Sequence, residues 1–199
     1  MPDAPTPPDA PAPPDAPPPS CQTDGFCHFF VATATRDQAT TASGIASLDD
    51  SCNTDVKRPV TTSTYKAFLV DGTTRVACTT DNCMGGGATE HVDWVLKPSR
   101  EYRRLDGTTV IGTTNEAGLL TFPLTNSVED ISQLVVTNAT STGMTATWTT
   151  SANTCNGWTT AMAGVSNAIG LWDATSTDLI GGIGSSGCSN VEMFLCVEQ

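Results

Sequence analysis

Short apolar runs separated by turn residues dominate the chain between residues 21 and 199. The segment from Gly25 to Thr35 is rich in aromatic and β-branched residues, which favours a strand. From Tyr65 to Val70 successive residues alternate between two faces, with Tyr65, Ala67 and Leu69 on one and residues 66, 68 and 70 on the other. The run ends at Asp71-Gly72, a dipeptide typical of a tight turn. A second short run, residues 100–105, also ends at such a dipeptide, Asp106-Gly107, and residues 109–111 follow as the next run. These patterns predict short strands joined by turns.

The remaining apolar segments complete an α+β pattern. Residues 45–52 favour a helix, although Gly44 weakens it, and residues 90–96 and 117–124 are further strand candidates. A last strand is expected from about Val191 to Val197, pairing with the first one. Between them, residues 126–189 are rich in Thr, Ser, Gly and Asn, which indicates long loops. We therefore predict an α+β domain with short, mostly antiparallel strands and one or two helices.

The first twenty residues do not fit this domain. They repeat Pro-Asp-Ala-Pro at Pro2, Pro8 and Pro14, and proline removes backbone donors and fixes φ. Such a segment favours extended polyproline II and would span about 60 Å. We interpret residues 1–20 as a disordered stalk and residues 21–199 as the folded domain. An unattached tail and a proline-rich ligand for another domain are the alternatives.

The acidic balance restricts the partners. The net charge is −12, and removing the three aspartates of the first twenty residues leaves −12 + 3 = −9 for the domain. Nucleic acids and anionic lipid surfaces require clustered Lys and Arg, so neither is an expected partner. Solubility outside the cell is the simplest explanation of the acidity.

The sequence predicts no membrane span, because it has no run of about 20 apolar residues. It also shows no signal peptide, which conflicts with its many cysteines unless a mature form carries an added Met1. We expect an extracellular or outer-surface protein that is tethered to a membrane without spanning it, for example as a lipoprotein.

Eight cysteines indicate four disulfides and an oxidising compartment. They are Cys21, Cys27, Cys52, Cys78, Cys83, Cys155, Cys188 and Cys196. The short spacings are wider than those of common zinc knuckles, which makes metal binding the weaker interpretation. Eight cysteines allow 105 pairings, and spacing alone does not choose among them.

The order of four of these cysteines resembles the C-type-lectin-like fold, whose chains also end in two cysteines about eight residues apart. In that family the helix cysteine pairs with the last one and the middle two pair together. The resemblance therefore implies Cys52–Cys196 and Cys155–Cys188, with Cys21–Cys27 and Cys78–Cys83 closing short loops. It implies a C-type-lectin-like domain with long loops held by disulfides.

A closer resemblance covers residues from about 26 to 199. The phrases "STYKAFLVDGTTRVACT", "TSANTCNGWTT" and "FLCVEQ" resemble a family of leptospiral and related bacterial surface proteins classed as a domain of unknown function. Some of its relatives are called endostatin-like and are linked to binding of host matrix and complement regulators. The proline-rich stalk differs from the expected leptospiral pattern.

Candidate metal sites are weak. The Glu-Pro-Asn or Gln-Pro-Asp loop and the Trp-Asn-Asp strand of the calcium-dependent lectins are missing, and the late loops offer only scattered oxygens. These are Asp173, Asp178, Asn190 and Glu192. Glu90, His91 and Asp93 form a compact group, and on a strand the last two would share a face. We interpret this group as hydrogen-bonding residues that orient a loop, and expect no cofactor.

The chain lacks the Gly-x-Ser-x-Gly frame of a hydrolase, so we expect no enzyme. Trp148 and Trp158 are expected in the core, whereas Trp172 with Asp173 is the better surface candidate and Asp178 lies in a nearby loop. We predict a non-enzymatic, metal-independent binding module for a protein or glycan, contacted by the long loops at Trp172, Asp173 and Asp178. The alternatives are a calcium-dependent lectin with non-standard ligands and a structural lipoprotein without a specific ligand.

Overall fold

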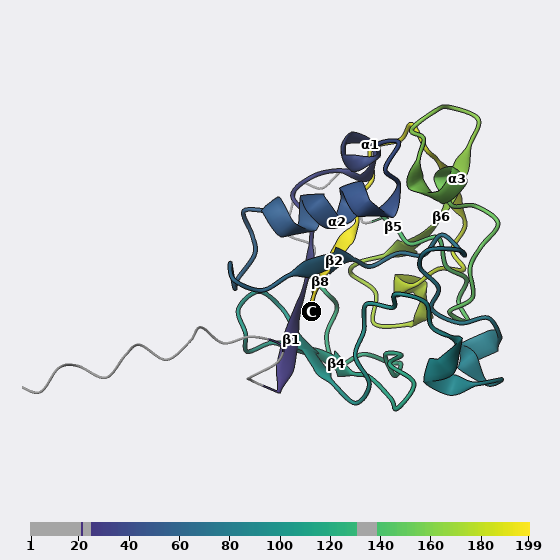
Figure 1. Ribbon diagram of the computed structural model, residues 1–199. Coiled ribbons are helices and arrows are strands. Elements are labelled where there is room, and N and C mark those ends of the chain that lie inside the picture. Colours follow the sequence, from purple (N-terminus) through teal and green to yellow (C-terminus); the bar gives the residue numbers. More distant parts are fainter. Residues whose placement is uncertain (1–20, 22–24, 131–138) are drawn as a thin grey trace, which may run out of the picture.

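The computed structural model describes residue 21, residues 25–130 and residues 139–199 (Figure 1). The expected stalk over residues 1–20 lies outside this range. The described part is a mixed α+β structure with few helices, as the sequence predicts, and its strands form two sheets. No helix in these ranges is long and apolar enough to cross a membrane.

The larger sheet has five strands in the order β2-β8-β1-β3-β4. They are β1 (Phe26–Val31), β2 (Tyr65–Ala67), β3 (Glu101–Arg103), β4 (Val110–Thr113) and β8 (Leu195–Glu198). The last strand, β8, lies between β2 and β1 and pairs antiparallel with both. All four of its residues are buried. The expected pairing of the terminal strand with the first strand is confirmed.

One pair in this sheet is parallel. Phe26 to His28 of β1 lie beside Glu101 to Arg103 of β3, and the other strand pairs are antiparallel. A parallel pair needs a long crossover connection, here residues 32–100, which carry the helices α1 (Arg36–Ala39) and α2 (Ile45–Thr54). Helix α2 contains the predicted helical segment and packs on β2 and β8 through Ile45, Leu48 and Cys52.

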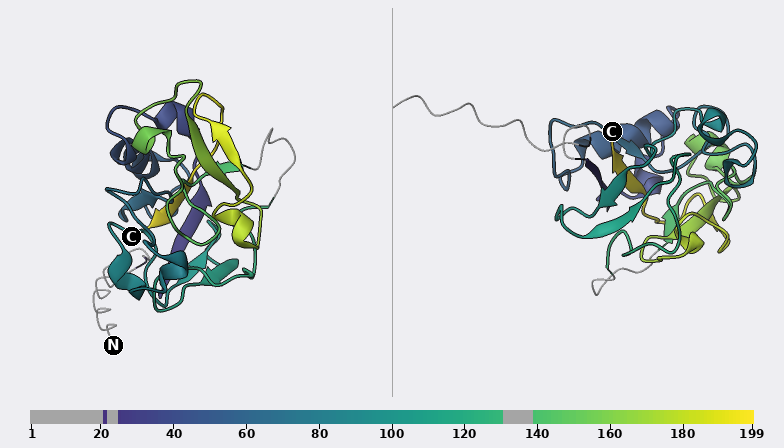
Figure 2. Two further views of the ribbon diagram at one scale, coloured as in Figure 1. Left: turned by 90° about the vertical axis from the view of Figure 1, so that its right-hand side faces the viewer. Right: turned by 90° about the horizontal axis from the view of Figure 1, so that it is seen from below.

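The long-loop region contains a second, three-stranded sheet in the order β5-β6-β7 (Figure 2). Its strands are β5 (Ala139–Ser141), β6 (Ser166–Leu171) and β7 (Ser185–Gly187). Short helical turns complete the molecule: η1 (Asp81–Cys83), η2 (Gly87–Glu90), α3 (Cys155–Trp158) and η3 (Thr177–Leu179).

Two turns share one hydrogen-bond pattern because they share the sequence Asp-Gly-Thr-Thr. In the first turn Asp71 Oδ1 accepts from the backbone N–H groups of Thr73 and Thr74, and Oδ2 accepts from the Thr74 hydroxyl. Asp106 makes the same three contacts in the turn between β3 and β4. These bonds to the ionised form hold the pKa of Asp106 far below its usual value.

Two expected strands are not formed. Residues 90–96 contribute only an isolated bridge between Val92 and Val76, because Asp93 has φ 45° and interrupts the extended backbone. The Asp93 carboxylate accepts from Arg75 and Lys66, and these contacts hold it in that conformation. Residues 117–124 make a single bridge at Leu120 instead of a strand.

Four disulfides cross-link the domain and use all eight cysteines. The pairs are Cys21–Cys27, Cys52–Cys196, Cys78–Cys83 and Cys155–Cys188, which match those implied by the resemblance. Cys52–Cys196 joins α2 to β8 across 144 residues, whereas Cys78–Cys83 spans 5. The long bond fixes the terminal strand in the sheet.

Removing the long disulfide should destabilise the domain far more than removing the short one. Loop-closure entropy assigns about 5 kcal/mol to Cys52–Cys196 and about 2 kcal/mol to Cys78–Cys83. For a domain of this size, 5 kcal/mol corresponds to a fall in Tm of roughly 10–20 °C. Calorimetry should compare Cys52→Ala/Cys196→Ala with the matched Cys78→Ala/Cys83→Ala variant. Equal falls in Tm would contradict the dominant role of the long bond.

Candidate functional site

The four tryptophans occupy buried positions, including the expected surface candidate. Trp148 and Trp158 are in the core, as predicted. Trp172 is also buried, with 2% of its surface exposed, so the expectation of an exposed Trp172 is wrong. The small polar residues that follow it in the sequence suggest a surface loop, but Trp172 belongs to the same buried apolar cluster as Val128 and Leu179.

Trp172 follows directly after β6, and its backbone is fixed on two sides. The Trp172 carbonyl accepts a hydrogen bond of 3.1 Å from the Val128 N–H. Two residues earlier, Gly170 lies against η3, where a Cβ atom would come within 2.0 Å of the Leu179 carbonyl oxygen. Glycine at this position therefore permits the close approach that sets the direction of β6.

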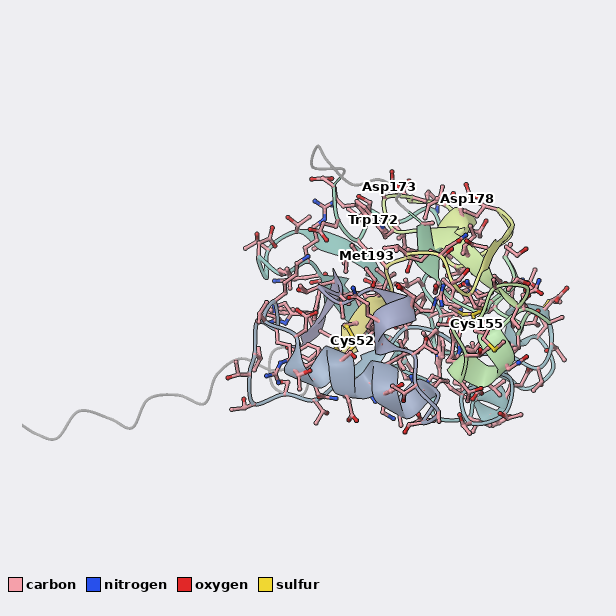
Figure 3. All side chains as sticks on the ribbon, turned by 90° about the horizontal axis from the view of Figure 1, so that it is seen from above. Cys52, Cys155, Trp172, Asp173, Asp178 and Met193 are labelled. Atoms are coloured by element: carbon pink, nitrogen blue, oxygen red, sulfur yellow. A yellow bond between two sulfur atoms is a disulfide. The ribbon has the colours of Figure 1, made fainter. Side chains whose placement is uncertain are left out.

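Trp172 lines a pocket of about 310 Å³ at the border between the two halves of the molecule. The other lining residues are Val31, Ala32, Thr33, Lys57, Glu129, Asp130 and Met193. They come from the end of β1, the segment after α2, the start of the long-loop region and the segment before β8. Figure 3 shows Trp172 and Met193 beside each other on this face.

The Trp172 indole N–H is buried and has no hydrogen-bond partner. Two other indole groups are satisfied: Trp94 Nε1 donates to the Gly118 carbonyl and Trp158 Nε1 donates to the Val70 carbonyl, both at 2.9 Å. A buried donor without an acceptor costs about 1–3 kcal/mol, so such groups are rare in stable proteins. The group is therefore the feature of this pocket that needs an explanation.

Two ion pairs form the polar side of the pocket. Lys57 Nζ lies 3.8 Å from Glu129 Oε2 and donates to the Val31 carbonyl at 3.3 Å. Asp130 accepts two hydrogen bonds from Arg104, at 2.6 and 2.8 Å. This bidentate contact lowers the pKa of Asp130 and raises the pKa of Arg104. The charged groups of the pocket are thus already paired.

A buried polar network positions the Met193 wall. Glu192 Oε2 accepts from Ser141 Oγ at 2.9 Å and from Asn167 Nδ2 at 3.0 Å. The Arg36 N–H donates to the Glu192 carbonyl at 2.6 Å, and the Ser141 N–H donates to the Met193 carbonyl at 2.9 Å. The segment before β8 is therefore held between α1 and the second sheet.

Arg36 supplies the positive charge of this network. Its guanidinium is completely buried, and Nη2 lies 3.7 Å from Glu192 Oε2. It donates to the carbonyl oxygens of Gly187, Cys188 and Asn190 and to Ser141 Oγ. Burial lowers the pKa of Arg36 and the charge of Glu192 opposes this shift. The side chain acts as a built-in cation inside a cage of oxygens.

The two aspartates of the predicted site are placed apart from the pocket lining. Asp173 follows Trp172 but is only partly buried, and Asp178 is exposed on η3, where its carboxylate accepts from Ser176 Oγ at 2.9 Å (Figure 3). Neither is among the described residues that line the pocket. The structure instead places Trp172 and Met193 in the lining of one pocket, an arrangement that the sequence did not reveal.

The oxygens considered for calcium do not converge. Glu192 and the Asn190 carbonyl face Arg36, whereas Asp178 lies on the surface. Within the described ranges, no group of three or more His, Cys, Asp or Glu side chains is arranged to hold a metal ion.

The group Glu90, His91 and Asp93 is divided among separate partners. Glu90 accepts from Thr79 and Thr80, and these hydrogen bonds outweigh the effect of burial and lower its pKa to about 2. His91 contacts the carbonyl oxygens of Ala77 and Ala117. His91 and Asp93 therefore act on different loops, which agrees with an orienting role.

Two further depressions lack a comparable group. One of about 600 Å³ is open, and none of the residues that line it is buried; they are Gly87, Ala88, Asn115, Glu116 and Ala117. A third pocket of about 200 Å³ lies on the other side of Glu129 and contains Arg104 and Phe30. The Trp172 pocket alone among these three contains an unpartnered buried donor.

The distribution of charge along the chain adds a signal that is visible in the sequence. No Lys, Arg or His follows Arg104, whereas eight acidic residues do: Asp106, Glu116, Glu129, Asp130, Asp173, Asp178, Glu192 and Glu198. The whole long-loop region is therefore without a basic side chain.

Comparison with known families adds to this geometry. Residues 35–177 match the family described as "Protein of unknown function (DUF1554)". The chain belongs to this family. The match includes the pocket residues Lys57, Glu129, Asp130 and Trp172, whereas Met193 and the end of β1 lie outside it. No curated protein matches the sequence. Membership of the DUF1554 family does not assign an activity to the pocket.

The Arg36–Glu192 pair should show strong energetic coupling. Arg36→Leu leaves Glu192 buried without a cation and should lower the free energy of unfolding by about 3–5 kcal/mol. Combining it with Glu192→Gln should cost less than the sum of the two single variants, because the unpaired charge is gone. Urea unfolding of the wild type, the two single variants and the double variant gives the four free energies of unfolding. The pair of Arg104 with the exposed Asp130 is the control, tested with Arg104→Leu and Asp130→Asn, and its coupling should be smaller, about 1 kcal/mol, because Asp130 remains solvated. Additive effects at Arg36 would contradict its role.

Removing the indole N–H should have opposite consequences at Trp172 and Trp158. Both Trp→Phe variants lose the same ring volume, but Trp158→Phe also leaves the Val70 carbonyl without its donor, whereas Trp172→Phe removes an unpaired group. Trp172→Phe should therefore be the more stable variant by about 1–3 kcal/mol. Urea unfolding provides the comparison. Equal losses would show that the Trp172 N–H has an acceptor in solution.

Proposed function

We propose that this protein is a non-enzymatic binding module displayed outside the cell, and that its ligand contacts the long-loop region at the Trp172 pocket. The observation that carries the proposal is the unpartnered indole N–H of Trp172 beside a pocket with apolar walls. Ligand pockets are commonly apolar with a few placed polar groups. A bound group that supplies an acceptor would remove the cost of the buried donor.

The proposed binding does not require a metal. Arg36 already provides a cation where the carbonyl oxygens of residues 187, 188 and 190 gather near Glu192. The oxygen cage is thus stabilised by the protein itself. This arrangement supports a metal-independent module over the calcium-dependent lectin.

A non-enzymatic role is favoured by the pocket's chemistry. Its described lining contains no histidine or cysteine, and its carboxylates face Arg104 and Lys57. The Thr33 hydroxyl donates to Asp55 Oδ1 at 2.9 Å, and the Thr33 N–H donates to Asp55 Oδ2, which fixes the end of β1. These groups hold the walls in place.

An extracellular location is supported by the four disulfides, since such bonds persist in oxidising compartments. We further propose a C-type-lectin-like fold, because a helix cysteine joins the terminal strand and that strand pairs with the first one. A tethered lipoprotein of a leptospiral-type surface family fits these features. This part of the proposal rests on fold-level analogy.

Calcium should leave the melting temperature unchanged. Calorimetry of the oxidised protein with EDTA, then with millimolar calcium, should give one Tm, because Arg36 occupies the described oxygen cage. A specific site filled at 100 times its Kd would add about 2.7 kcal/mol, which is several degrees here. A calcium-dependent rise would overturn metal independence and direct attention to Asp173, Asp178 and Glu192.

Partner binding should depend on the pocket. The full chain, screened on arrays of glycans and matrix proteins, should bind a partner more weakly when Met193→Ala removes part of the pocket wall. Met84→Ala is the matched control, because Met84 is 80% exposed and lies outside the long-loop region. Equal binding by the two variants would place the contact elsewhere, and absence of any partner would refute the binding module.

A further inference from the structure

We propose that the Trp172 pocket binds an uncharged aliphatic group that carries one hydrogen-bond acceptor, as the side chain and amide carbonyl of an N-acylated aliphatic amino acid do. This inference rests on the proposed binding function and specifies its ligand class.

The described polar side chains of the pocket are paired with one another or with nearby groups, except for one hydrogen-bond donor. Lys57 faces Glu129 and the Val31 carbonyl, and Asp130 is held by Arg104. The N–H and O–H of Thr33 both donate to Asp55. Among the described side chains that line the pocket, only Trp172 has a buried polar atom without a partner, its indole N–H. A ligand that contains a hydrogen-bond acceptor would therefore satisfy the Trp172 N–H. A charged ligand would form no new ion pair, because the charged side chains of the pocket are already paired.

Neither an anionic nor a cationic ligand finds an unpaired charge in the described lining of the pocket. An anion would compete with Glu129 for Lys57, the one basic side chain in the described lining of the pocket. A cation would have to displace Lys57 from the same carboxylate. In either case burying the charge without a new partner carries a desolvation cost.

The apolar residues that line the pocket indicate that the ligand has an aliphatic part. Val31 and Ala32 are buried, and Met193 is partly buried against the same core as Trp172. Methionine adapts its shape to an apolar ligand. A volume of about 310 Å³ is at the small end of ligand pockets and suits one side chain with its amide.

A sugar is a poorer fit for the same surfaces. Sugars stack on exposed aromatic faces, but Trp172 is only 2% exposed and offers no such face. Each additional hydroxyl would also need a partner, whereas the described side chains of the lining offer one buried donor without a partner. Buried polar groups without partners weaken binding.

A charge series of one side chain tests this ligand class. The probes are N-acetyl-leucinamide, which is neutral, leucinamide, which is cationic, and N-acetyl-leucine, which is anionic; methyl glucoside represents a sugar. Each is titrated into the ¹⁵N-labelled full chain, and the indole N–H signal that disappears in Trp172→Phe identifies Trp172. We expect N-acetyl-leucinamide to bind at least about tenfold more tightly than the other probes and to shift this signal downfield.

Two variants assign the interaction to its atoms. Trp172→Phe keeps most of the ring but loses the donor, so it should weaken binding of the neutral probe about tenfold. Trp158→Phe removes an N–H that already donates to Val70 and should leave binding unchanged in the folded protein. Equal affinity in the wild type and in Trp172→Phe would overturn the role of the indole.

The remaining outcomes each overturn the ligand class. Preference for N-acetyl-leucine would assign binding to Lys57, preference for leucinamide would assign it to Glu129, and preference for the glucoside would assign it to a sugar. Absence of binding by all four probes would show that the pocket takes no group of this kind. If Met193→Ala still reduces array binding in that case, the proposed function stands; if the neutral probe binds but no array partner does, the pocket stands and the wider function fails.

Discussion

The insertion of β8 between β2 and β1 is the constraint on which the rest of the structure depends. These two neighbours are far from β8 in the sequence, so their pairing with β8 joins the two ends of the folded domain. The Cys52–Cys196 bond holds β8 against α2, and the buried Glu198 carboxylate accepts from the backbone N–H groups of Cys21 and His28. Because β8 is fixed, the segment before it is fixed as well. That segment carries Glu192 into the Arg36 network and Met193 into the pocket wall.

The long-loop region is stabilised by tertiary contacts more than by its short secondary structure. The α3 turn contains Cys155, Asn156 and Trp158 with φ of 50°, 53° and 65°. A left-handed conformation costs about 1–2 kcal/mol for each such residue, and other contacts have to offset it. The Cys155–Cys188 bond holds one end of the turn, and the hydrogen bond from Trp158 to Val70 holds the other. These contacts hold the α3 turn in place, although the strands of the second sheet have only three to six residues.

Local signals in the sequence predicted the elements that depend on neighbouring residues. The helix that ends near Cys52 and the two Asp-Gly turns are of this kind, since periodicity and turn chemistry decide them. The parallel pairing of β1 with β3 was not predicted, because it depends on a crossover of about seventy residues that no local pattern specifies. The interruption at Asp93 was missed because Arg75 and Lys66, distant in sequence, provide its partners.

The same distinction applies to the pocket. Trp172 was identified as a candidate from the composition of its loop, but it is buried in an apolar cluster whose other members, such as Val128 and Leu179, are not its sequence neighbours. Met193 was not considered at all, since nothing local distinguishes it from a core residue of the last strand. The absence of basic residues after Arg104 was visible in the sequence, but the charges around the pocket depend on the fold, because Lys57 lines it from another segment and Arg104 pairs with its Asp130.

The fixed walls of the pocket and the missing acceptor for the Trp172 N–H together favour a preformed binding site. A site whose walls are held by a disulfide-anchored strand and by paired charges has little conformational entropy left to lose on binding. Its selectivity then depends on what the fixed polar groups lack, and the lining described here lacks only an acceptor for the Trp172 N–H. In a flexible loop the indole could turn to water and the cost of its burial would vanish. The buried donor persists because β6, η3 and the Val128 contact hold the tryptophan in place, and this makes the pocket selective for an acceptor on an apolar body.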